Sequence, residues 1–218
     1  MLCNAGLALE CDGQVLLIDL PNYDFPPFYP LPEDTWKRII EGERPYERVC
    51  GIYFSHDHPD HLHKEKLAAF KGAHSGVPVF LPGFENDEGV VEMGPFRIFW
   101  KLAPHAPLPG ELPPHVISWV EADGESLYLP ADAALAVPVH EAFLNGRKAC
   151  MGIWNSMYLS RPETRCLMHR AAHKNYVYHM PACQDDKSGI WRKCRNNLQR
   201  YPDELRDIVI MDRYPYVI

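Results

Sequence analysis

Hydrophobic and polar positions alternate over short distances along this chain, and the runs predict strands interleaved with helices. Residues 7–11 and 14–19 form two apolar runs on either side of Asp12-Gly13, and an Asp-Gly pair in that place is a strong signal for a two-residue hairpin. Residues 49–54 are apolar and rich in β-branched and aromatic side chains, which predicts a buried strand. Comparable runs predict further strands at 77–81, 96–102, 116–120, 126–129, 176–179 and 208–210.

Fewer segments have the pattern of a helix. Glu33-Asp34 places acidic side chains in the first turn of a helix over 33–40, where the helix dipole favours them, and Gly42 ends it. Three more helices are predicted at 64–70, 137–144 and 189–199, and the last of them is basic. Residues 20–32 are rich in proline and aromatic residues, so they predict a structured loop. The pattern by itself indicates a mixed α and β protein.

Composition limits the class of protein. The chain has 218 residues, of which 46% are hydrophobic and 23% charged, and we expect one globular domain over residues 1–218 without a membrane span. The first residues lack the basic and apolar regions of a secretory signal. Seven scattered cysteines, none in a Cys-x-x-Cys pair, indicate reduced thiols and a cytoplasmic location.

Charge is distributed unevenly. Residues 1–146 carry 9 Lys+Arg and 22 Asp+Glu, whereas residues 147–218 carry 13 and 7. The basic final third could attract an anionic substrate, although a solvated face that balances the acidic part is the more common reason for such a surplus. The overall net charge of −7 argues against a nucleic-acid partner.

The most informative segment is the loop that follows the strand over 49–54. It holds three of the chain's eleven histidines together with a carboxylate, at His56, His58, Asp60 and His61. Imidazole nitrogen and carboxylate oxygen suit zinc, with manganese or iron as alternatives. Because His56 and His58 are two residues apart, they point the same way on extended backbone and can hold one ion. Asp60 and His61 follow a turn and would face a neighbouring ion.

The spacing His-x-His-x-Asp-His resembles the signature of the metallo-β-lactamase superfamily. In that superfamily the first two histidines hold one metal ion and the Asp-His pair holds the second. The resemblance therefore implies two divalent metal ions per chain, with zinc preferred. It also implies an α+β fold, a metallo-β-lactamase-like αββα sandwich of two mixed sheets with outer helices. Positions that match the superfamily follow in the same order from Asp19 to His179.

The resemblance assigns further ligands downstream. Asp132 ends an apolar segment and matches the aspartate that bridges both ions, while the alternative role is a helix N-cap. His179 ends a short strand and matches the last ligand, with His169 and His173 as competitors. Asp19 closes a strand where the superfamily often has an aspartate that hydrogen-bonds a metal histidine.

The third histidine of the first ion has two candidates. His105 follows a strand and opens the proline-rich loop 104–114, where the superfamily usually carries this ligand, and it is the preferred assignment. His115 begins the next strand, and a tight turn at 123–124 would pair it with Asp132, within reach of a metal ion. Asp57 could support the loop between the first two histidines. Surface or packing roles are expected for His63, His74 and His140.

The implied site predicts a metal-dependent hydrolase. A water molecule shared by two ions would lose its proton near neutral pH and could attack a carbonyl or phosphoryl group. Asp60 and Asp132 are the candidate catalytic carboxylates. A small phosphodiester, such as a cyclic phosphate or a nucleotide-like molecule, is the preferred substrate, and an ester, lactone or thioester is the alternative. A metal-binding regulatory protein without turnover is the alternative from another class.

Two features depart from the superfamily or narrow its branches. The stretch between Asp132 and His179 is short, and residues 150–175 lack the pattern of the long helix often found there. The branch with a redox di-iron centre carries a glutamate where this chain has His58, which argues against an oxidative role.

The expected partner is a small anionic molecule, with homo-oligomerisation left open and no membrane partner. In the basic segment 187–195, Lys187 or Arg192 could pair with a phosphate while Trp191 stacks on a ring of the substrate. The alternative places Trp191 in the core and the basic side chains in solvent.

Overall fold

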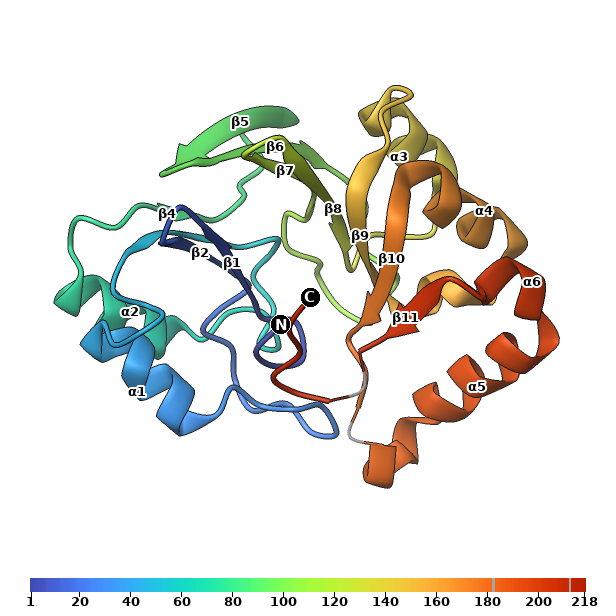
Figure 1. Cartoon of the computed structure of the whole chain (residues 1–218), viewed down its shortest axis with the longest axis horizontal. Helices are drawn as coiled ribbons and strands as arrows, with labels where there is room; N and C mark the ends of the chain where they lie inside the picture. Colours follow the sequence, from blue (N-terminus) through green and yellow to red (C-terminus); the bar gives the residue numbers. More distant parts are fainter. Residues whose placement is uncertain (182, 212) are drawn as a thin grey trace.

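The computed structural model describes residues 1–181, 183–211 and 213–218, and it contains two β-sheets packed face to face (Figure 1). The smaller sheet has the order β1-β2-β3-β4, formed by Leu7–Cys11, Gln14–Ile18, Val49–Tyr53 and Val79–Phe80. The larger sheet has the order β11-β10-β9-β8-β7-β6-β5. Its strands are β5 (Glu88–Met93), β6 (Phe96–Leu102), β7 (Val116–Ala122), β8 (Glu125–Ala131), β9 (Ala149–Asn155), β10 (Ala172–Tyr178) and β11 (Ile208–Ile210).

Helices cover the outer face of each sheet. The smaller sheet packs against α1 (Glu33–Glu41) and α2 (Lys64–Ala73), which lie together in Figure 1. The larger sheet packs against α3 (Val137–Leu144), α4 (Pro162–Ala171), α5 (Ile190–Arg200) and the short α6 (Pro202–Leu205). Two 3₁₀ turns, Ser156–Ser160 and Cys183–Ser188, complete the elements. The order of layers is helix, sheet, sheet, helix, so the αββα sandwich expected from the histidine motif is confirmed.

The apolar runs of the sequence form strands that are buried on both faces. In β2, Leu16 and Ile18 face the other sheet, whereas Val15 and Leu17 face the helices of their own side. Such double burial needs a continuous apolar run rather than alternation. Between the sheets, the hydroxyl groups of Tyr53 and Ser118 lie 2.7 Å apart, which satisfies both buried oxygens.

The topology gathers several strand ends at one edge of the sandwich. β2, β3 and β4 run parallel, and so do β8, β9, β10 and β11. The carboxyl ends of parallel neighbours lie at the same edge of a sheet, so the residues that follow them can converge. Asp19, Asp132 and His179 each come directly after a strand, and the loop 55–61 begins one residue beyond β3.

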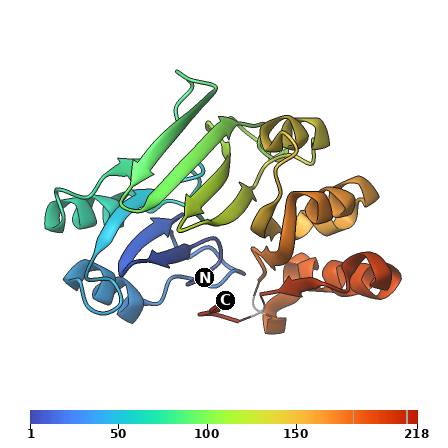
Figure 2. The same ribbon diagram turned by 45° about the horizontal axis from the view of Figure 1, so that its top comes forward.

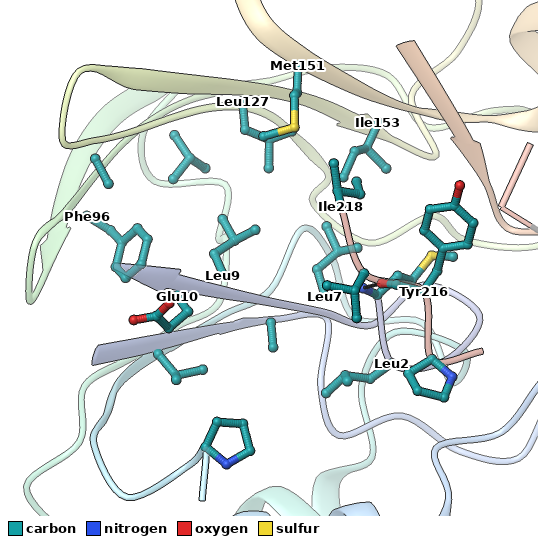
Figure 3. Close-up of a pocket in the computed structure, with 18 of the residues that line it drawn as sticks. Leu2, Leu7, Leu9, Glu10, Phe96, Leu127, Met151, Ile153, Tyr216 and Ile218 are labelled. Atoms are coloured by element: carbon teal, nitrogen blue, oxygen red, sulfur yellow. Dashed lines mark hydrogen bonds between the residues drawn. The ribbon is translucent and has the colours of Figure 1, made fainter. Parts of the chain in front are cut away.

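The other edge of the sandwich holds a cavity of ≈ 600 Å³. Figure 3 shows its mainly apolar lining, which includes Leu7, Leu127 and Met151, and none of the candidate metal ligands contributes to it. The chain termini meet beside this cavity, where the backbones of Met1 and Tyr216 exchange hydrogen bonds of 2.7 and 2.9 Å (Figure 2). Within the described residues, every helix is too short or too polar to cross a membrane.

Most elements predicted from the sequence are present, and four of the observed helices and strands were not predicted. The predicted hairpin, the helix closed by Gly42, and the elements over 96–102, 137–144 and 208–210 match the observed ones. The missed elements are β5, β9, α4 and the short α6. The segment between Asp132 and His179 therefore contains a strand and a ten-residue helix, where the sequence showed no helical pattern.

Trp191 lies in the core, so the suggestion that it stacks on a substrate is wrong and the alternative is confirmed. Its side chain is 6% exposed, packs in the cluster beneath α4 and α5, and donates a hydrogen bond of 2.7 Å to the carbonyl of Pro181. Arg192, the next residue, is exposed.

Trp191→Ala should destabilise the fold because it removes a large side chain from a packed core. We expect the free energy of unfolding to fall by about 3–5 kcal/mol, as is usual for such truncations. Arg192→Ala is the matched control and should change it by less than about 0.5 kcal/mol. Urea denaturation followed by circular dichroism measures both, and equal effects of the two variants would contradict this placement.

Candidate metal centre

The seven candidate ligands predicted from the sequence lie together in two adjoining groups. The first group contains His56, His58 and His105, and within it each residue offers a ligand atom within 4.8 Å of the others. The second group contains Asp60, His61, Asp132 and His179 and meets the same limit. Every one of these residues stands in a loop after a strand end, so the two sheets together fix the positions of the groups.

The carboxylate of Asp132 connects the two groups. Its Oδ2 atom lies 3.3 Å from Nε2 of His61 and 3.7 Å from Nε2 of His179, both in the second group. The same oxygen lies 4.0 Å from Nε2 of His56 and 4.0 Å from Nε2 of His105, both in the first group. One carboxylate oxygen is thus placed between four imidazole nitrogens, which is the position of a ligand shared by two ions.

Several ring nitrogens in these groups are buried without a hydrogen-bond partner. The Nε2 atoms of His56, His61 and His105 all have this property. Buried polar atoms nearly always have a hydrogen-bond partner. Three buried ring nitrogens without one, next to the carboxylates of Asp60 and Asp132, therefore indicate a site for a cation. Nitrogen and oxygen donors of this kind suit a divalent metal ion. The donor set of both groups therefore fits metal binding.

The opposite ring nitrogen of these histidines is held by a fixed partner. Nδ1 of His61 lies 3.0 Å from Oδ2 of Asp19, and Nδ1 of His105 donates to the carbonyl of Ala106 over 2.6 Å. Nδ1 of His56 lies 2.8 Å from the hydroxyl of Ser55, which itself donates to Asp19. Such contacts fix the tautomer with the proton on Nδ1 and leave Nε2 free to bind a metal.

Asp19 occupies an unusual backbone conformation that serves this network. Its φ is 53°, in the left-handed region, directly after β2. There its Oδ1 accepts a hydrogen bond of 2.7 Å from the backbone N–H of Ser55, while Oδ2 faces His61. One fully buried aspartate thus anchors both the start of the histidine loop and one of its rings.

His115 lies beside the site but outside both groups. Its Nε2 accepts a hydrogen bond of 3.1 Å from the backbone N–H of Asp132, so this nitrogen is already occupied. The register of β7 and β8 sets Ser118 opposite Leu129, and the residues that continue these strands toward the site bring His115 beside Asp132, as the sequence had indicated. The structure therefore brings His105, and not His115, together with His56 and His58.

The other candidates have contacts elsewhere. Asp57 forms an ion pair of 2.7 Å with Lys64, which ties the histidine loop to α2. His169 hydrogen-bonds the carbonyl of Glu204, and His173 is exposed. The remaining histidines have packing or capping contacts, with His63 at the start of α2, His74 against Ile40, and His140 between Tyr128 and Tyr158.

The electrostatic environment favours the forms that bind metal ions. Burial lowers the pKa of His56 well below its ordinary value, and the neighbouring rings of His61 and His115 lower it further. Burial alone would raise the pKa of Asp60, but His61 and His179 outweigh it and hold the pKa at about 2. His56 is therefore a neutral ring and Asp60 an ionised carboxylate, which are the forms that metal coordination requires.

The rings of the second group have the opposite tendency. Burial would lower the pKa of His61, but the surrounding carboxylates of Asp19, Asp60 and Asp132 raise it well above its ordinary value. The pKa of His179 is raised in the same way by Asp132 and Asp60 against the effect of burial. Excess negative charge at this group calls for a cation, and a divalent metal ion would replace the proton on these rings.

Two asparagines that sequence analysis did not single out also contribute to the site. Asn155, at the end of β9, donates a hydrogen bond of 2.6 Å to Oδ1 of Asp132 and leaves Oδ2 to face the histidines. Asn4 places its amide nitrogen 3.4 Å from Nε2 of His179. Asparagine is common in loops and caps, so only the position of Asn155 after an apolar strand could have drawn attention to it.

Solved structures with low sequence identity share this architecture. The metallo-beta-lactamase fold protein YhfI from Bacillus subtilis superimposes with a TM-score of 0.65 at 13% identity, covering 98% of this chain and 90% of YhfI. Igni18, a metallo hydrolase from the archaeon Ignicoccus hospitalis, gives 0.58 at 13%, with coverages of 99% and 94%. The diiron β-hydroxylase CmlA from Streptomyces venezuelae gives 0.63 at 11%, with coverages of 97% and 52%, so this chain spans about half of CmlA.

No family model and no curated protein matches the sequence. The sheets, the outer helices and the structural similarities nevertheless agree. The chain has the metallo-β-lactamase fold, and the resemblance noted at residues 56–61 is confirmed at the level of the fold.

The two candidates for the third histidine can be separated by metal content. Because His105 belongs to the first group, His105→Ala should remove one of two bound ions per chain. His115→Ala should retain both ions, with affinity reduced by about 10–100-fold, the usual loss for a residue that supports a ligand. His115→Gln, which restores an acceptor for the Asp132 N–H, should recover most of that loss. Metal analysis combined with chelator competition measures all three, and a reversed order of effects would assign the ligand to His115.

Proposed function

We propose that this chain is a metal-dependent hydrolase that acts through two divalent metal ions. The observation that carries the proposal is the placement of Asp132 Oδ2 within 4.0 Å of the Nε2 atoms of four histidines, which are drawn from both ligand groups. A non-catalytic metal protein on this fold would tolerate losses among these positions, whereas all seven side chains are present and converge.

In this proposal His56, His58 and His105 hold the first ion, Asp60, His61 and His179 hold the second, and Asp132 is shared. Ions bound there would supply a water molecule of lowered pKa and would draw charge from a substrate oxygen. Zinc suits these donors best, and manganese and iron are the alternatives.

Individual side chains of the chain have distinct tasks around that centre. Asn155 donates a hydrogen bond to Oδ1 of Asp132, so Oδ2 is the oxygen that points between the two ligand groups. Asp60 is the better candidate for a proton acceptor, because its side chain is 13% exposed and its Oδ2 stands 3.0 Å from Nε2 of His179. Asp19 and Ser55 keep the rings of His56 and His61 oriented and thereby reduce the cost of assembling the site.

A small phosphodiester is the preferred substrate within this proposal. Two divalent ions bring more positive charge than Asp60 and Asp132 neutralise, so the loaded site favours an anionic substrate. Igni18 is described as a metallo hydrolase, which is consistent with hydrolysis on this fold. CmlA, at 11% identity, informs the fold and not the reaction. Ester, lactone or thioester hydrolysis is the second candidate, because the same centre can polarise a carbonyl oxygen.

Metal content and turnover test the proposed function directly. Protein purified without chelator should contain well above one metal ion per chain, and it should hydrolyse bis-p-nitrophenyl phosphate faster than p-nitrophenyl acetate or a simple lactone. Chelation should abolish turnover, and zinc or manganese should restore it. Protein that stays metal-free after reconstitution would refute the proposal, and preferential turnover of the ester or lactone would select the second candidate.

The contribution of the basic segment after His179 can be tested separately. Lys187 and Arg192 are exposed residues of this segment, and removing both should raise KM for a phosphodiester and leave the KM of a neutral ester unchanged. Exposed charges are worth roughly 0.2–1 kcal/mol each, so the expected rise for the two together is about 2- to 30-fold. A double variant of Lys37 and Lys71, on the helices of the other sheet, is the control for overall charge. Equal effects on both substrate types would remove the electrostatic argument.

A further inference from the structure

Asn4 is a buried polar side chain at the second ligand group with an unmet requirement for a partner. It lies in the segment before β1 and is 2% exposed. Its amide nitrogen stands 3.4 Å from Nε2 of His179, and its Oδ1 is buried without any hydrogen-bond partner. A buried amide oxygen of this kind normally has a donor or a cation beside it.

The distance between the amide nitrogen of Asn4 and Nε2 of His179 equals the usual distance between two donor atoms bound to one metal ion. Donor atoms that bind a metal at about 2.1 Å in a tetrahedral arrangement stand about 3.4 Å from each other. The candidate ligands of the group show comparable spacings, with 3.0 Å between His179 Nε2 and Asp60 Oδ2 and 3.3 Å between His61 Nε2 and Asp132 Oδ2. The amide nitrogen of Asn4 thus stands at a ligand-like separation from His179, one of the candidate ligands.

The chemistry of the amide indicates which of its atoms faces the ion. Once Nε2 of His179 donates its lone pair to a metal, it can no longer accept a hydrogen bond from the amide nitrogen. The two ends of a carboxamide exchange places by a half-turn of its terminal torsion, and their assignment follows from the surrounding network. Amide oxygen is a good ligand for hard divalent cations. The turn would bring Oδ1 to the metal and end its isolation.

We propose that Oδ1 of Asn4 is an additional ligand of the ion held by Asp60, His61, Asp132 and His179. The inference rests on the proposed two-metal centre and deepens it. With Asn4, the second group offers three residues with oxygen donors and two histidines, whereas the first offers three histidines and the shared Asp132. Oxygen-rich sites favour harder ions and higher coordination numbers, so the second position should accept manganese more readily than the first.

The surrounding chain holds Asn4 firmly in this place. Its backbone N–H donates to the carbonyl of Tyr29 over 3.0 Å. Gly6 packs so closely on Leu20 that an added Cβ would stand 2.3 Å from a side-chain carbon. Asn22, next to this segment, donates over 3.1 Å to the carbonyl of Asp60, one of the ligands. The segment and the ligand loop are therefore fixed together, which lowers the entropic cost of recruiting Asn4.

Asn4→Leu and Asn4→Asp test the assignment with zinc and cobalt as probes. Leucine is similar in size but has no atom that can bind a metal. Asn4→Leu should therefore lower the affinity for one of the two zinc ions by at least about 10-fold in chelator competition and leave the affinity for the other unchanged. The visible spectrum of the cobalt-loaded variant should intensify, because loss of one ligand lowers the coordination number. Aspartate keeps an oxygen at the same place, so Asn4→Asp should bind zinc at least as tightly as the unmodified chain.

Three further observations separate this proposal from a purely structural role and from the proposed function. If Asn4 only donates a hydrogen bond to His179, both variants should lower the melting temperature of the chelated protein equally and leave the cobalt spectrum unchanged, which would overturn the assignment. Two zinc ions of unchanged affinity in Asn4→Leu would overturn it while leaving the two-metal centre intact. An unmodified chain that binds no metal would overturn both.

Discussion

The carboxylate of Asp132 is the group on which the rest of the site depends. It is 7% exposed and surrounded by imidazoles, and a buried charge of this kind is tolerated only with compensating partners. The fold supplies such partners on both oxygens: Asn155 donates to Oδ1, and the Nε2 atoms of four histidines lie within 4.0 Å of Oδ2. The backbone is fixed as well, because His115 accepts a hydrogen bond from the Asp132 N–H. Because these hydrogen bonds fix Oδ1 and the backbone of Asp132, Oδ2 can point only between the two ligand groups. In that orientation it is placed to be a ligand shared by two ions.

The placement of Asp132 is in turn a matter of strand register. β7 pairs with β8 through a two-residue turn at Asp123-Gly124, both in left-handed conformation, and this pairing leads His115 and Asp132 to the same edge of the sheet, where they share a hydrogen bond. A slip by one residue would turn Asp132 to the other face of the sheet. β8 also pairs in parallel with β9, which brings Asn155 to the same edge. The packing of apolar side chains between the sheets fixes the strand register. The register in turn fixes the positions of the candidate ligands that follow the strand ends.

The sequence could predict the ligands that lie close together along the chain more readily than those that lie far apart. His56, His58, Asp60 and His61 share one loop, so local spacing was sufficient. Asp132 and His179 could be found because each ends an apolar strand. The choice between His105 and His115 required tertiary geometry, since both adjoin strands that reach the site. The helix α4 was missed because its buried face includes Thr164 and Arg165, which hide the apolar periodicity. The buried guanidinium of Arg165 donates hydrogen bonds to Glu204 and to the Leu159 carbonyl.

The two ligand groups differ in a way that bears on how a reaction could be divided between them. Burial holds the pKa of His56 well below its ordinary value, and the rings of His56 and His105 are oriented through Nδ1 and packed against one another, so the first group is a rigid nitrogen site. The second group concentrates Asp60, Asp132 and the nearby Asp19, and its side chains reach partial exposure at Asp60. A rigid nitrogen site suits an ion that stays in place through turnover, whereas an oxygen-rich and more accessible site suits the ion that exchanges ligands with substrate. In the proposed function, substrate would then approach from the side of Asp60 and His179, where the ring of Phe28 stands edge-on to His179 at 4.7 Å.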